Sequence, residues 1–175
     1  PPRPRPRRHR LRMPEMLEFT LTRYPEPVLR KVAEPVAAFD QELADTVEAM
    51  FALMYRSQGV GLAAPQVGLR RRILVLDPAG DPDDEQSDPL VLVNPTLVEL
   101  SGSPTVYEEG CLSFPGIFAE VRRPERCRVR AVGIDGKPFE AEYDGFTSRI
   151  VQHEYDHLEG VLLVDRMSPA DKQRH

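Results

Sequence analysis

The sequence predicts a single α+β domain, with mixed or antiparallel β-sheets packed around a central helix. Three features lead to this prediction: an amphipathic helix near the start, a β-rich middle, and a further helix close to the end. The length of 175 residues suits one domain, and we find no internal repeat and no dividing linker. We therefore expect one folded domain over residues 14–175, preceded by a tail over residues 1–13.

The composition is that of an ordinary globular protein, with 41% hydrophobic and 29% charged residues. No apolar run approaches the roughly 20 residues that a membrane span needs. Residues 1–12 carry six of the 23 basic residues and no acid, which leaves 17 basic against 28 acidic residues in the rest. An acidic domain repels phosphate, so we expect no specific nucleic-acid partner.

The first 12 residues, PPRPRPRRHRLR, are rich in proline and arginine and offer nothing to bury. This composition predicts disorder over residues 1–13. Three interpretations stay open: upstream read-through, the remnant of an organelle-targeting segment, or a basic arm for ribosomal RNA.

The first helix is predicted to begin after Asp40, a suitable N-cap, and to end near residues 57–59. Five apolar residues recur at helical spacing on one face: Leu43, Val47, Met50, Phe51 and Met54. We interpret the two methionines as core residues. A short strand is predicted before this helix, over residues 17–22.

The middle of the chain predicts a series of short strands. They cover residues 73–76, 90–93, 96–100, 117–122, 127–134 and 138–143. Asp135-Gly136 is a hairpin signal between the last two strands. Cys127 lies in an alternating apolar pattern, so we expect it to be buried rather than to bind a metal. The acidic stretch over residues 80–85 lacks the spacing of a calcium loop and is expected to be solvated.

Two helices are predicted towards the C-terminus. The first runs from about Phe146 to Leu158, and Gly160 lies in its C-cap region. The second begins at Ser168-Pro169, because serine is a good N-cap and proline is favoured at the first helical position.

The run HEYDH over residues 153–157 indicates a metal site. Helical positions i and i+4 lie one turn apart on one face, so His153 and His157 can reach a single ion. Glu154 follows the first histidine directly and can reach a water beside that ion. Apart from His9 in the tail and the terminal His175, the chain has no other histidine.

A catalytic site of this kind needs a third protein ligand and an open position for water. Extended zincins place a histidine where this chain has Leu163, and other zincins use a downstream glutamate, but none follows Glu159. Cys111 is the better candidate, because it follows Gly110 in a predicted loop where the backbone can approach an ion closely.

Three stretches resemble the signature motifs of the peptide deformylases. Their sequences are GVGLAAPQ, EGCLS and QHEYDHLEG, and they occupy residues 59–66, 109–113 and 152–160. They follow the family's order and usual separations, and the similarity extends over about residues 17–168. The form is most similar to that of plant organelles and many bacteria. The resemblance implies a catalytic domain that removes the N-formyl group from the N-terminal methionine of new polypeptides.

The resemblance also implies roles for several residues of these motifs. The expected ligands of one divalent ion are Cys111, His153 and His157. The resemblance implies Fe²⁺ as the native ion, with Zn²⁺, Ni²⁺ or Co²⁺ as other occupants. Glu154 moves the proton from water to the departing amine, while the Gln66 side-chain amide and the Leu112 N–H stabilise the oxygen that gains negative charge. Gln152 is expected to orient a ligand or the loop.

The peptide substrate is expected to lie as an added strand along the segment that Gly59 and Gly61 bracket. An apolar pocket for the methionine side chain is predicted from the helical stripe that carries the ligands. Val60, beside the glycines, and Tyr107, just before Glu108, resemble in position the residues that line the family's methionine pocket. The residues expected to contact the substrate are Val60, Gly61, Tyr107, Gly110, Phe146 and Ile150.

N-formylmethionyl nascent peptides are the expected partners, and the ribosome is a further candidate. The expected location is the bacterial cytoplasm, or a plastid or mitochondrion if the basic tail is a targeting remnant. Two cysteines make no disulfide framework, which favours a reducing compartment.

Two other functions stay open, a zincin-like endopeptidase and a non-catalytic metal-stabilised binding module. The missing third zincin ligand and the small size of the domain argue against the first. Glu154 argues against the second, because a structural site is usually closed by four protein ligands.

Overall fold

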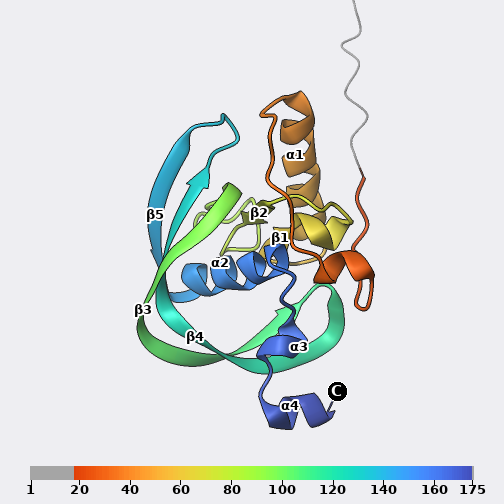
Figure 1. The fold of residues 1–175 in the computed structure, drawn as a ribbon, viewed down its shortest axis with the longest axis vertical. Coiled ribbons are helices and arrows are strands. Elements are labelled where there is room, and N and C mark those ends of the chain that lie inside the picture. Colours follow the sequence, from red (N-terminus) through yellow and green to blue (C-terminus); the bar gives the residue numbers. More distant parts are fainter. Residues whose placement is uncertain (1–17, 175) are drawn as a thin grey trace, which may run out of the picture.

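The computed structural model describes residues 18–174 and confirms the predicted single α+β domain (Figure 1). The predicted tail, and Leu17 of the first predicted strand, lie outside these residues. The elements are η1 (Pro27–Arg30), α1 (Gln41–Arg56), β1 (Gly61–Ala63), η2 (Ala64–Val67), β2 (Ile73–Leu76), β3 (Leu90–Cys111), β4 (Phe114–Val132), β5 (Pro138–Asp144), α2 (Gly145–Leu158), α3 (Leu163–Arg166) and α4 (Pro169–Arg174). Within this range no helix is long and apolar enough to cross a membrane.

The five strands form one sheet in the order β1-β2-β3-β4-β5, and every neighbouring pair is antiparallel. β3 and β4 have 22 and 19 residues and form a long hairpin that curves around α2 (Figure 1). The register shifts at several points along this hairpin, for example between Ser101 and Pro104. Such bulges bend the strands, so the sheet can wrap around the helix.

The sequence divided these long strands too finely. Residues 90–93 and 96–100 belong to one strand, β3, and residues 117–122 belong to β4 together with the next predicted strand up to Val132. Prolines weaken the strand signal because they lack an N–H donor. In the structure Pro104 and Pro124 lie opposite each other, so the two missing donors share one place in the ladder. The strand predicted over residues 17–22 does not form in its described part, residues 18–22.

The two long helices cover opposite faces of the sheet at β2. Ile73 and Val75 pack into the cluster that includes the apolar face of α1, and Leu74 and Leu76 pack with apolar residues of α2. Successive side chains of a strand point to opposite faces, so β2 is buried at all four positions. This packing holds α2, which carries both histidines, against the centre of the sheet.

The caps predicted for α1 and α2 also form. The Asp40 side chain accepts a hydrogen bond from the Leu43 N–H at 3.0 Å. After α2, Gly160 has φ +72°, and the Val161 N–H donates to the Asp156 carbonyl at 2.9 Å. This left-handed residue ends the helix and turns the chain back towards η1.

Gly160→Ala should destabilise the fold much more than Gly116→Ala. Both glycines have a positive φ, +72° and +74°, so alanine adds similar backbone strain at each. A Cβ at Gly160 would lie 2.5 Å from the Arg30 carbonyl oxygen, whereas no atom of the described residues lies within 4 Å of a Cβ at Gly116. We expect an extra loss of about 1–3 kcal/mol in unfolding free energy at Gly160, measured by urea denaturation. Equal midpoints would contradict this assignment.

Candidate metal centre

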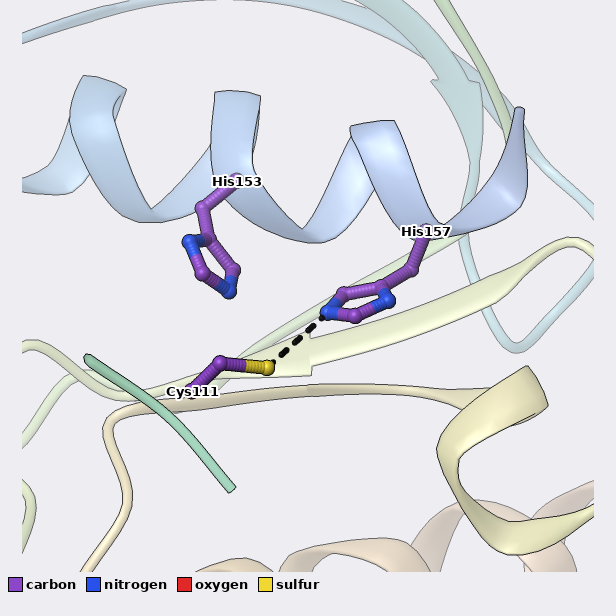
Figure 2. Close-up of side chains that lie close together, drawn as sticks. All are labelled: Cys111, His153 and His157. Atoms are coloured by element: carbon purple, nitrogen blue, oxygen red, sulfur yellow. Dashed lines mark hydrogen bonds between the residues drawn. The ribbon is translucent and has the colours of Figure 1, made fainter. Parts of the chain in front are cut away.

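Cys111, His153 and His157 come together from two elements (Figure 2). Cys111 ends β3, and the two histidines project from one face of α2 towards it. One ligand atom from each residue lies within 4.8 Å of the other two, and Cys111 Sγ is 3.4 Å from His157 Nε2. One thiol and two imidazoles in this arrangement make a three-ligand set with room for a further ligand.

Cys111 does not lie in an open loop, as the sequence suggested. It is the last residue of β3 and pairs with Phe114, the first residue of β4, across the turn of Leu112 and Ser113. Gly110 and Ser113 weaken the strand signal in the sequence, but the long hairpin extends the pairing to this point. The sheet therefore sets the direction of the thiol.

Glu109 orients His153. The sequence did not indicate this role, although Glu109 is the first residue of the EGCLS motif. Its Oε1 accepts hydrogen bonds from His153 Nδ1 at 2.9 Å and from Arg123 Nη2 at 3.0 Å. Its Oε2 accepts from Arg123 Nε at 2.7 Å and from Arg149 Nη1 at 2.6 Å. With Nδ1 occupied, Nε2 of His153 is the nitrogen left for an ion.

The same contacts keep Glu109 ionised. Burial opposes its charge, but hydrogen bonds from His153 and Arg123 outweigh burial and lower the pKa of Glu109 to about 2. A charged carboxylate accepts the His153 Nδ1–H and so fixes the tautomer of the imidazole.

Glu154 lies beside the three ligand residues, with its side chain buried. Its Oε2 accepts no hydrogen bond from the described residues, and Oε1 is 3.9 Å from His153 Nε2. Burial raises the pKa of Glu154 to about 7, although His153 opposes the shift. A buried carboxylate oxygen without a partner is unfavourable unless another group or water binds it. Glu154 is therefore placed to exchange a proton with a molecule in this site.

The donor set fits a divalent ion of the Zn²⁺, Fe²⁺, Co²⁺ or Ni²⁺ type. Burial, and next the neighbouring His153, lower the pKa of His157 well below its ordinary value, which favours the neutral imidazole that binds metals. The His157 Nδ1 is buried and makes no hydrogen bond with the described residues.

Hydrogen bonds at both ends fix the orientation of the Gln66 side chain. Its Oε1 accepts from the Ala63 N–H at 2.9 Å, and its Nε2 donates to Ser113 Oγ at 3.2 Å. The Ser113 hydroxyl in turn donates to the Thr22 carbonyl at 2.7 Å. The Gln66 Nε2 also lies 3.6 Å from Cys111 Sγ, so this amide points its N–H groups at the ligand cluster.

Gln152 does not touch the ligands. Its Nε2 donates to the Pro124 carbonyl at 2.9 Å and to Ser148 Oγ at 3.0 Å, which ties α2 to β4. Both partners lie in regular elements, so these contacts reach neither a ligand side chain nor a loop, the two roles expected for Gln152. Cys127 is fully buried in the apolar cluster beneath α2, as predicted.

A cleft of about 340 Å³ opens beside His153 and Glu154. All six residues expected to contact the substrate line it: Val60, Gly61, Tyr107, Gly110, Phe146 and Ile150. Leu112 lines it as well, whereas Gln66 and His157 are not part of its lining. The rings of Tyr107 and Phe146 lie 6.1 Å apart and form an aromatic wall. The cleft thus leads from an apolar wall to Cys111 and His153.

Gly61 permits the close approach of α2 to this cleft. A Cβ at this position would lie 2.7 Å from Ile150 Cγ2 and 2.9 Å from Glu154 Cγ. Gly61 belongs to β1, which is an edge strand and pairs only with β2 within the sheet. Within residues 18–174, no other strand of the sheet pairs with the second edge of β1.

Comparison with known proteins identifies the relatives of this chain. The family described as polypeptide deformylase matches residues 19–173. Peptide deformylase of Chromobacterium violaceum is 46% identical over 159 residues, which cover 91% of this chain and 92% of the relative. Peptide deformylase 1B, chloroplastic/mitochondrial, of Arabidopsis thaliana is 46% identical over 148 residues, 85% of this chain, but the match spans only 54% of that longer protein.

Solved structures give the same result. A crystal structure of a plant peptide deformylase superposes with a TM-score of 0.86 at 44% identity, covering 89% of this chain and 84% of the other. The peptide deformylase of Thermotoga maritima superposes with a TM-score of 0.81 at 43% identity, covering 87% and 99% of the two chains. Both the sequence and the fold are therefore similar to those of the relatives.

Proposed function

The chain belongs to the polypeptide deformylase family, and we propose that it removes the N-formyl group of new polypeptides through an ion held by Cys111, His153 and His157. The family is metal-dependent, and the chain is an enzyme of this kind. The observation that supports our site assignment is the convergence of one thiol and two imidazoles beside the buried, unpartnered carboxylate oxygen of Glu154.

A divalent ion bound there would supply Lewis-acid activation of water and of the formyl oxygen. Glu154 accepts the proton of the attacking water and delivers it to the amine that leaves. The Gln66 Nε2 and the Leu112 N–H donate to the formyl oxygen as negative charge develops on it. Glu109 holds His153 in one orientation, because its Oε1 accepts the Nδ1–H.

The substrate enters the cleft with its backbone along β1 and its methionine side chain against the apolar wall. An extended peptide can use the free edge of β1 for main-chain hydrogen bonds, which tolerate many different sequences. Ile150 and Phe146 lie on the same helical stripe as the ligands, so the side chain next to the formyl group meets them.

Fe²⁺ is the working ion in our proposal, with Zn²⁺, Ni²⁺ and Co²⁺ as other occupants. The donor set accepts all four, so metal analysis after anaerobic purification, paired with activity, distinguishes them. With iron, activity should decay in air as ferrous iron and the thiolate oxidise. Indifference to oxygen would point to zinc or nickel.

We further propose that the enzyme acts where formylated chains are made, with nascent peptides at the ribosome as its partners. The relatives include bacterial proteins and one named for chloroplasts and mitochondria. The bacterial cytoplasm is our first choice, and an organelle is the alternative if the basic tail is a targeting remnant.

Formyl-Met and formyl-Ala tripeptides test the methionine pocket. Replacing methionine by alanine should lower kcat/KM by an amount that corresponds to roughly 1–3 kcal/mol of activation free energy, the burial value of such a side chain. Ile150→Asp should slow the formyl-Met peptide while its metal content stays unchanged. Equal rates for the two peptides would refute the pocket.

An acetylated peptide separates deformylation from endopeptidase activity. We expect mass spectrometry to show loss of the formyl group alone from a formyl-Met peptide, with the acetylated peptide and all internal bonds intact. Internal cleavage would instead support the zincin-like alternative.

A further inference from the structure

Arg149 lines the cleft from α2 and, unlike His153 and Glu154 of the same helix, has no role in the proposed reaction. It lies three residues after Phe146 and four before His153, on the same helical stripe. Only 7% of the residue is exposed. Burying an arginine is unfavourable unless its N–H groups have hydrogen-bond partners, so the partners of Arg149 indicate its role.

On one side, Arg149 reaches the group that orients a metal ligand. Its Nη1 donates to Glu109 Oε2 at 2.6 Å, while the other oxygen of the same carboxylate accepts the His153 Nδ1–H. Arg123 contributes the remaining two bonds to Glu109. The carboxylate therefore has four donors, and Arg149 supplies one of them.

On the other side, Arg149 supports the wall of the cleft. Its Nη2 donates to the Thr105 carbonyl at 2.7 Å and to Thr105 Oγ1 at 3.0 Å. Its guanidinium carbon lies 5.5 Å from the centroid of the Tyr107 ring, a cation–π distance. Tyr107 is 53% exposed, so burial alone does not fix its ring. The contacts with Arg149 and Phe146 hold the ring at the cleft.

We propose that Arg149 is a positioning residue that joins the substrate wall to the metal centre, holding Tyr107 and Glu109 with one guanidinium. The inference deepens the proposed function and rests on it. Arginine suits this role because its planar fork presents five donors at fixed angles, whereas lysine offers one compact charge. Lysine can replace the bond to Glu109 but cannot also hold Thr105 and stack on Tyr107.

Two variants and one control test the proposal. Arg149→Met removes both functions, and Arg149→Lys keeps only a charge for Glu109. Arg166→Met is the matched control. The half-exposed Arg166 donates to Asp156 at 3.0 and 3.1 Å, and Asp156 also accepts from Arg123 Nη1 at 3.0 Å, so Arg166 lies at the far end of the charge network that includes Glu109. For each variant we would measure kcat and KM on formyl-Met and formyl-Ala tripeptides, the rate of metal release to a chelator, and the thermal midpoint.

Arg149→Met should release metal about tenfold faster, which is the lower end of the effect seen when residues that orient metal ligands are replaced. Its kcat should also fall. Arg149→Lys should keep metal release and kcat near the parent values. Its KM for the formyl-Met peptide should nevertheless rise about fivefold, because the aromatic wall loses its support. Its KM for the formyl-Ala peptide should change less, since alanine does not reach that wall.

We expect Arg166→Met to lower only the thermal midpoint. The proposal is overturned if both Arg149 variants behave in the same way, that is, if their kcat, KM and metal release equal those of the parent at temperatures below the midpoint. It is also overturned if lysine restores KM together with kcat, because a single charge would then suffice. If the proposed function itself were wrong, the parent enzyme would not deformylate the peptides. The metal-release measurement does not depend on turnover, so the two failures can be distinguished.

Discussion

Cys111→Ser should lose most of the bound metal and most of the activity. The substitution replaces a soft thiolate with a hydroxyl that stays protonated at neutral pH and binds these ions poorly. The change is small in volume and lies at the end of β3, where the backbone pairing with Phe114 does not depend on the side chain. The measurement is metal content per chain after gel filtration, together with the rate on a formyl-Met peptide.

Cys127→Ser is the control for this experiment. Cys127 is fully buried beneath α2 and lies outside the ligand cluster, so its variant should keep the metal. It should lose some stability, about 1–3 kcal/mol, because a hydroxyl replaces a thiol in an apolar cluster. Full metal occupancy in the Cys111 variant would remove Cys111 from the ligand set.

Glu154→Gln should leave the metal bound while turnover falls by about 10² or more. Glutamine has the size of glutamate, so the contact with Gly61 and the packing of α2 are preserved, but it cannot accept and return a proton. Metal content and kcat measured on the same preparation separate these two effects.

Glu159→Gln, just past the C-terminal end of the same helix, provides the comparison. Glu159 follows α2 and pairs with Arg72 at 2.6 Å, away from the cleft lining. It should retain parent turnover, since its carboxylate reaches no reacting atom. Near-normal turnover in Glu154→Gln would mean that this residue only positions its neighbours.

Much of the helical part of the site could be predicted from the chain itself. The spacing of His153 and His157 places both imidazoles on one face of any helix, and the apolar pattern of α1 marks its buried face in the same way. Such relations depend on residues within one or two turns. The three motifs together were specific enough to indicate the family, which the comparisons confirm.

Only the tertiary structure decided which distant side chains face each other. Cys111 and His157 are 46 residues apart, and Glu109 and His153 are 44 apart. Their meeting depends on the register, bulges and turn of the β3–β4 hairpin and on the packing of α2 against it. No local spacing encodes these relations. Glu109 therefore pairs with Arg123 and Arg149, and positions His153, only because the folded sheet wraps around the helix. The sequence alone does not indicate these contacts.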